Sequence, residues 1–114
     1  MTRKILLISD DTNFKSYLNI VTLTITKLNH QITFTDDISD IYSDFILIDM
    51  DDNFDGRLEL IRKFRQAGAQ PNKKIISVKT ELDDEIRKKI FEAGCDSVMN
   101  KEEFNTAAGN ILIY

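Results

Sequence analysis

Ile5-Leu6-Leu7-Ile8-Ser9-Asp10-Asp11 is an apolar run that ends in two acids, and it decides how the rest of the chain is interpreted. A second run, Phe45-Ile46-Leu47-Ile48, is followed directly by Asp49, and a third segment, 96–100, is followed directly by Lys101. Near-continuous apolar runs of this kind are typical of strands that are buried on both faces of a parallel sheet. Because the carboxyl ends of parallel strands meet at one edge, we expect three carboxylates and one ammonium group to gather there.

The composition is that of an ordinary globular chain. Its 114 residues, 42% of them hydrophobic and 30% charged, predict a single domain, residues 1–114, with its own core. The formal net charge of −4 argues against direct binding to nucleic acid, which depends on neutralising phosphates. No apolar run approaches the length of about 20 residues that spans a membrane. The single cysteine, Cys95, excludes an internal disulfide, so we expect a cytoplasmic chain.

Strands and helices are expected to alternate along the chain. Five segments have the apolar or alternating pattern of β-strands, at residues 4–9, 30–35, 44–49, 74–79 and 96–100. Between them, apolar residues recur at steps of three and four, which predicts helices at about 12–28, 57–67 and 82–93 and one from about 102. Residues 37–42 leave room for little more than one turn, so the second helix is expected to be very short or absent.

The first helix is the least clear of these segments. Residues 21–26 are rich in β-branched side chains and alternate as a strand does. The longer pattern, however, is helical, because apolar residues recur over about four turns at Phe14, Leu18, Val21, Ile25 and Leu28. We therefore predict a helix, with Asp11 or Thr12 as its N-cap.

Five strands that alternate with helices predict an α/β fold, in which a doubly wound parallel sheet has helices on both faces. Ligands bind such sheets at the carboxyl ends of the strands. Carboxylates buried side by side there either have raised pKa values or require a cation, and oxygen ligands of this kind favour Mg²⁺. A carboxylate beside Mg²⁺ can act as a nucleophile toward phosphorus, and Lys101 can neutralise phosphoryl oxygens.

With these residues in place, the whole chain resembles the receiver domain of response regulators in two-component signalling. The resemblance is carried by an ordered set of positions rather than by any one of them: Asp10-Asp11, Asp49, Asp55-Gly56, Ala93-Gly94 and Lys101. It implies a flavodoxin-like, CheY-like sheet with the strand order 2-1-3-4-5.

The resemblance also implies roles for individual residues. Asp49 is the expected phosphoacceptor, Lys101 pairs with the phosphoryl group, and Asp11 binds Mg²⁺ directly. Asp10 binds it directly or through water, Asp49 is a further metal ligand, and Asp51 contributes its backbone carbonyl. The implied partner is a histidine kinase or phosphotransfer protein. The phosphorylation state would be passed on by binding to an unidentified effector protein. Homodimerisation is also possible in this family. No enzyme activity is expected beyond self-catalysed phosphotransfer and autodephosphorylation.

Several positions depart from the family pattern. The hydroxyl residue usual at the end of strand four is replaced by Lys79, and Thr80 follows one position later. Lys79 either takes the place of the hydroxyl by its charge or pairs with Asp49. Thr80 could supply the hydroxyl if the strand slipped by one residue, but such a slip would exchange the strand's two faces. Val98 occupies the place of the usual aromatic switch residue in strand five.

Other functions stay open at this point. The departures favour a pseudo-receiver, which would use the same fold to bind proteins without being phosphorylated. Asp49-Met50-Asp51 also resembles the motif of haloacid-dehalogenase-type phosphatases. A Ca²⁺-binding EF-hand loop fits residues 51–58 in part, but its twelfth position is Arg62 instead of Glu. If that loop is instead a solvated acidic turn, Gly56 is expected at a positive φ.

Overall fold

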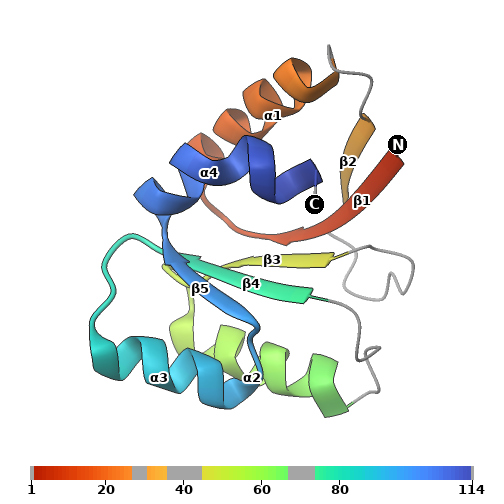
Figure 1. The fold of residues 1–114 in the computed structure, drawn as a ribbon. Helices are drawn as coiled ribbons and strands as arrows, with labels where there is room; N and C mark the ends of the chain where they lie inside the picture. The colour runs from red at the N-terminus through yellow and green to blue at the C-terminus, as the bar shows by residue number, and fades with distance from the viewer. Residues whose placement is uncertain (1, 27–30, 36–44, 67–73, 114) are drawn as a thin grey trace.

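A five-stranded parallel sheet lies between two layers of helices in the computed structural model, which describes residues 2–26, 31–35, 45–66 and 74–113 (Figure 1). The elements follow one another as β1 (Thr2–Ile8), α1 (Thr12–Thr26), β2 (Gln31–Thr35), β3 (Phe45–Asp49), α2 (Phe54–Gln66), β4 (Lys74–Lys79), α3 (Asp84–Ala93), β5 (Ser97–Asn100) and α4 (Lys101–Ile113). No helix among the described residues is long and apolar enough to cross a membrane.

The order of the strands in the sheet is β2-β1-β3-β4-β5, and all neighbours run parallel. This confirms the predicted flavodoxin-like fold. Strand β1 pairs with β2 on one side and with β3 on the other, so the order of connection reverses between β1 and β3. That reversal is where ligands bind in open α/β sheets. The expected shortening of the second helix concerns residues 37–42, which lie outside the described residues.

The two faces of the sheet have different cores. Helices α1 and α4 cover one face, and α2 and α3 cover the other (Figure 1). Alternate residues of each central strand point to opposite faces, which is why β3 is buried throughout. The core beneath α1 and α4 is formed by Ile5, Leu7, Phe14, Leu18, Phe45, Leu47, Ile76, Val78, Phe104 and Ala108. The other is formed by Leu6, Ile8, Ile46, Ile48, Met50, Leu58, Ile61, Ile75, Ile90, Ala93, Cys95 and Val98.

Helix α1 forms despite the β-branched residues in its second half, as the longer apolar pattern predicted. Phe14 and Leu18 lie on the face that packs against the sheet and are 4% and 0% exposed. Their burial outweighs the weak local preference for strand, since packing of one face supplies most helical stability. Asp11 is the N-cap: its Oδ1 accepts hydrogen bonds from the backbone N of Asn13 and Phe14, at 3.0 and 3.2 Å.

Helix α2 begins at Phe54, three residues earlier than predicted. Asp55 and Gly56 therefore lie in its first turn, and the expectation of a positive φ at Gly56 is wrong. The residue with positive φ is Asn53, at 47°. Gly56 is favoured because a Cβ there would lie 2.2 Å from Nδ2 of Asn53. An EF-hand loop cannot form either, because residues that it would need as loop are helical.

Glycine is required at the end of α3. Gly94 has a φ of 118°, and its N–H donates to the carbonyl of Phe91 at 3.0 Å. Arg65 of α2 donates from Nε to the carbonyl oxygen of Gly94 at 2.7 Å, so this turn also joins the two helices. A Cβ at this position would lie 2.6 Å from Cγ of Arg65.

We expect Gly94→Ala to lower the free energy of unfolding by roughly 1–3 kcal/mol, because the left-handed backbone is strained for alanine and Arg65 must move. The control is Glu92→Ala, an exposed position on the same helix, where the change is expected to stay within about 0.5 kcal/mol. Urea denaturation measures both. Equal losses in the two variants would contradict the argument.

Candidate functional site

The predicted site residues meet at the carboxyl edge of the sheet. Asp10 and Asp11 directly follow Ser9, the first residue after β1, and Asp49 is the last residue of β3. Lys101 is the first residue of α4, immediately after β5. Because β1 and β3 are neighbours and parallel, Asp11 and Asp49 lie close together, and the start of α4 brings Lys101 to them.

Asp49 is completely buried, and both of its carboxylate oxygens accept hydrogen bonds. Its Oδ2 accepts from Ser9 Oγ at 2.6 Å and from Lys101 Nζ at 2.9 Å. Its Oδ1 accepts from the backbone N of Asp51 at 3.0 Å. A buried carboxylate is tolerated only when it is paired and hydrogen-bonded in this way. The carboxylate is therefore held in one fixed position at the end of β3.

Lys101 is the centre of the cluster. Its Nζ lies 3.0 Å from Asp11, 2.9 Å from Asp49 and 2.7 Å from Asp51, and its side chain is 13% exposed. The same atom lies 5.2 Å from the centre of the Phe14 ring, within the range of a cation–π contact. Burial by itself would lower the pKa of Lys101, but the hydrogen bonds to the three carboxylates raise it above its ordinary value. The ammonium form is therefore stable here.

Asp51 contributes its side chain as well as its backbone. Its Oδ2 accepts from Thr80 Oγ1 at 2.6 Å, and its Oδ1 accepts from the backbone N of Thr80 at 3.0 Å. Burial would raise the pKa of Asp51, but the hydrogen bonds from Lys101 and Thr80 lower it to about 2. The pKa of Asp11 is also lowered, chiefly by its hydrogen bond with Lys101. Both carboxylates thus stay ionised because an internal cation is present.

Asp10 and Lys79 lie at the margin of this cluster. The side chain of Asp10 is 76% exposed and pairs with Arg57, with 3.4 Å between Oδ2 and Nη2. Lys79 Nζ lies 3.7 Å from Asp51 Oδ1, whereas Asp49 pairs with Lys101 within the described part of the chain. Thr80 reaches Asp51 without a slip of the strand, since Lys79 keeps its place in β4 opposite Asn100.

The arrangement suits a divalent cation in chemistry but holds Lys101 in its place. Within the parts of the chain that the structure describes, no group of three His, Cys, Asp or Glu side chains is arranged to hold a metal ion. Instead, carboxylate oxygens from Asp11, Asp49 and Asp51 surround the ammonium of Lys101. Oxygen donors of this type are those that Mg²⁺ prefers, at about 2.0–2.1 Å. The donor types therefore suit the ion, while in this structure their oxygens contact the ammonium of Lys101.

Two contributions to the site were missed in the sequence. Ser9 lies inside the cluster, where it donates to Asp49 and its Oγ accepts from the backbone N of Asp11 at 3.1 Å. Its position, a hydroxyl directly before two acids in a buried strand, was a signal that could have been used. The side chain of Asp51 gave no comparable signal, because its direction depends on the turn that follows β3.

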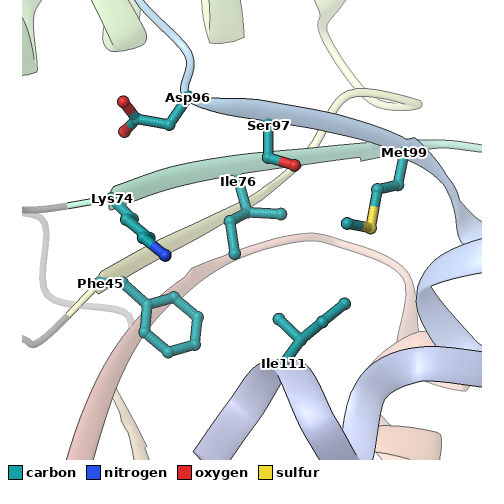
Figure 2. Close-up of a pocket in the computed structure, with 7 residues that line it drawn as sticks. All are labelled: Phe45, Lys74, Ile76, Asp96, Ser97, Met99 and Ile111. Carbon is teal, nitrogen blue, oxygen red and sulfur yellow. The ribbon is translucent and has the colours of Figure 1, made fainter. Parts of the chain in front are cut away.

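A cavity of about 410 Å³ lies at the opposite edge of the sheet, between the first residues of three strands and α4 (Figure 2). Its lining is mostly apolar and consists of Phe45, Lys74, Ile76, Asp96, Ser97, Met99 and Ile111. The carboxylate of Asp96 points away from it in Figure 2 and accepts a hydrogen bond from the backbone N of Ile75 at 2.7 Å. The cavity contains none of the predicted site residues.

Comparison with models of known protein families finds no match, and comparison with curated proteins finds none either. Solved structures do match. A response regulator from Burkholderia multivorans has a TM-score of 0.72 at 22% identity and covers 99% of this chain and 94% of its own. The phosphorylated cyanobacterial phytochrome response regulator RcpA has a TM-score of 0.73 at 12% identity, and the match covers 97% of this chain and 91% of RcpA.

A further match has a different assignment. CpaE of Burkholderia thailandensis, assigned to pilus assembly, has a TM-score of 0.72 at 17% identity and covers 97% of this chain and 95% of its own. These likenesses extend over almost the whole chain and show that it has the CheY-like fold of receiver domains. At such identities they show the fold alone.

The lowered pKa of Asp51 predicts a loss of stability in acid. Because the pKa of about 2 in the folded chain is below the ordinary value of 3.8, the ionised carboxylate stabilises the fold above about pH 4, and this contribution is lost as the pH falls toward 2. We expect wild type to exceed Asp51→Asn in free energy of unfolding by roughly 1–2 kcal/mol above pH 4, after allowance for solvent screening, and by little at pH 2.

Urea titrations from pH 6 to pH 2 measure this difference. Asp51→Asn in a Lys101→Met background is the control, because the main partner of Asp51 is then absent and the pH dependence should shrink. A difference that stays constant over the whole pH range would rule out the assigned ion pair.

Proposed function

We propose that the chain is a receiver domain that accepts a phosphoryl group on Asp49 from a histidine kinase or phosphotransfer protein and passes on its state by binding another protein. The observation that supports this most is the geometry of Asp49. It is a fully buried carboxylate at the carboxyl end of the central strand β3, 2.9 Å from the ammonium of Lys101. In a CheY-like fold, this geometry supports a role for Asp49 as the nucleophile and for Lys101 as the cation that binds the phosphoryl group.

The chemistry is a direct transfer. A carboxylate oxygen of Asp49 attacks the phosphorus of a phosphohistidine, the phosphorus–nitrogen bond breaks, and the imidazole leaves with the electron pair and takes up a proton. An acyl phosphate results on Asp49. Lys101 stabilises the phosphoryl oxygens by charge and by hydrogen bonding, and the backbone N of Asp51 holds Asp49 in position at 3.0 Å.

Mg²⁺ is the proposed cofactor. Asp11, Asp49 and the backbone carbonyl of Asp51 would hold it, with Asp10 bound directly or through water. When bound, the ion would neutralise charge on the phosphoryl group. Asp11 and Asp49 would serve both the ion and Lys101, since each already accepts a hydrogen bond from Lys101 Nζ through its Oδ2.

A pseudo-receiver is the second candidate, and specific observations favour it. Lys101 is already surrounded by three carboxylates, Lys79 stands where the family usually has a hydroxyl, and Val98 is 5% exposed at the switch position. In that case the chain would bind its effector, or a second copy of itself, without phosphorylation. The two candidates share the fold and differ in whether Asp49 reacts.

Mass spectrometry after incubation with acetyl phosphate and Mg²⁺ separates the candidates. We expect wild type to gain one phosphoryl group and Asp49→Ala to gain none, because the nucleophilic carboxylate is then missing. Chelation of Mg²⁺ should reduce the gain in wild type. Asp55→Ala is a matched control, since it removes an exposed acid from the first turn of α2 outside the cluster.

No gain in any protein would leave the pseudo-receiver as the better account for this donor. A gain that persists in Asp49→Ala would show that another residue is modified.

A further inference from the structure

The side chain of Asp51 occupies hydrogen-bond donors that a phosphoryl group on Asp49 would need. Its Oδ2 lies 2.7 Å from Lys101 Nζ and 2.6 Å from Thr80 Oγ1, and its Oδ1 lies 3.0 Å from the backbone N of Thr80. We infer that Asp51 is an internal competitor for the anion at this site: it holds Lys101 and Thr80 in the unmodified chain and must release them when Asp49 is phosphorylated. The inference rests on the proposed function and adds a means of regulating it.

The carboxylates of Asp49 and Asp51 lie next to each other and contact the same ammonium group. The backbone N of Asp51 donates to Asp49 Oδ1 at 3.0 Å, and both side chains contact Lys101 Nζ, at 2.9 Å for Asp49 and 2.7 Å for Asp51. A phosphoryl group bonded to an oxygen of Asp49 extends from that carboxylate by the length of one phosphorus–oxygen unit. Its oxygens would therefore compete with the Asp51 carboxylate for Lys101.

Charge makes joint occupancy unfavourable. A phosphoryl group brings a charge of about −1.5 to −2 beside the carboxylates of Asp11 and Asp51. Among the described residues, Lys101 and Lys79 form ion pairs with these carboxylates, and Lys79 Nζ lies 3.7 Å from Asp51 Oδ1. Neighbouring anions repel one another unless a cation or a hydrogen-bond donor lies between them. The incoming anion and the Asp51 carboxylate therefore compete for the same donors.

Release of Asp51 needs only a side-chain rotation. The side chain is 25% exposed and follows β3, outside the hydrogen-bonded ladder of the sheet, so it can turn toward water without disturbing the core. Within the described residues, the adjacent Asp52 makes no hydrogen bond or ion pair with Lys101 or Thr80. Asp52 therefore serves as a control that carries the same charge one residue away.

The test is a titration with inorganic phosphate, followed through the amide chemical shift of Thr80. If Asp51 competes, Asp51→Ala frees both donors, and we expect half-saturation at a phosphate concentration at least about tenfold lower than in wild type. Asp51→Asn keeps an acceptor oxygen but loses the charge, so its half-saturation should lie between the two. Asp52→Ala should remain within about twofold of wild type, because Asp52 has no hydrogen bond or ion pair with Lys101 or Thr80 in the described structure.

Equal half-saturation in wild type and both Asp51 variants would overturn the inference. An equal gain in Asp52→Ala would also overturn it, because the effect would then be one of net charge. Asp51→Asn keeps the test valid if Asp51→Ala does not fold, which a thermal melt detects. The titration needs no covalent transfer. A gain specific to Asp51, together with no phosphorylation of Asp49, would therefore count against the proposed function for that donor and still support competition by Asp51 for the anion site.

Discussion

The ammonium of Lys101 is the interaction on which the arrangement of the site depends. Three carboxylates converge at the carboxyl edge of the sheet, and each lies within 3.0 Å of this one cation. Without it, the fully buried Asp49 would lack its charged partner, and the loss of one member of a buried ion pair typically costs about 3–5 kcal/mol. The low pKa of Asp51 has the same origin, with Thr80 as a second contributor. Lys101 thus offsets the negative charge of the three carboxylates in this structure.

The topology of the sheet makes this convergence possible. Asp11 and Asp49 are brought together because β1 and β3 are parallel neighbours, although 38 positions separate the two residues along the chain. Lys101 enters from β5, two strands away from β3, because it begins α4, which packs across the face that α1 also covers. Each charged residue is thus placed by an apolar strand before it. The chemistry at the edge therefore depends on the two hydrophobic cores that fix the strands.

The sequence was sufficient for the features that depend on pattern. The buried strands, the doubly wound sheet and the helical state of α1 all followed from apolar spacing, and Asp49 with Lys101 followed from the positions of strand ends. What could not be predicted depends on local backbone geometry. Asn53 rather than Gly56 has the positive φ, so α2 begins early, and the turn directs the Asp51 carboxylate inward. Asp10 turns to Arg57 for a similar reason, since adjacent residues after a strand point in different directions.

A crystal structure of the chain with Mg²⁺ and beryllium fluoride, an analogue of the phosphoryl group, tests the account most directly. The predicted result is beryllium fluoride bound to Asp49, with Lys101 as one of its donors and the Asp51 carboxylate turned out into solvent. A structure under those conditions with Asp49 unmodified and Asp51 still bound to Lys101 and Thr80 would contradict the account.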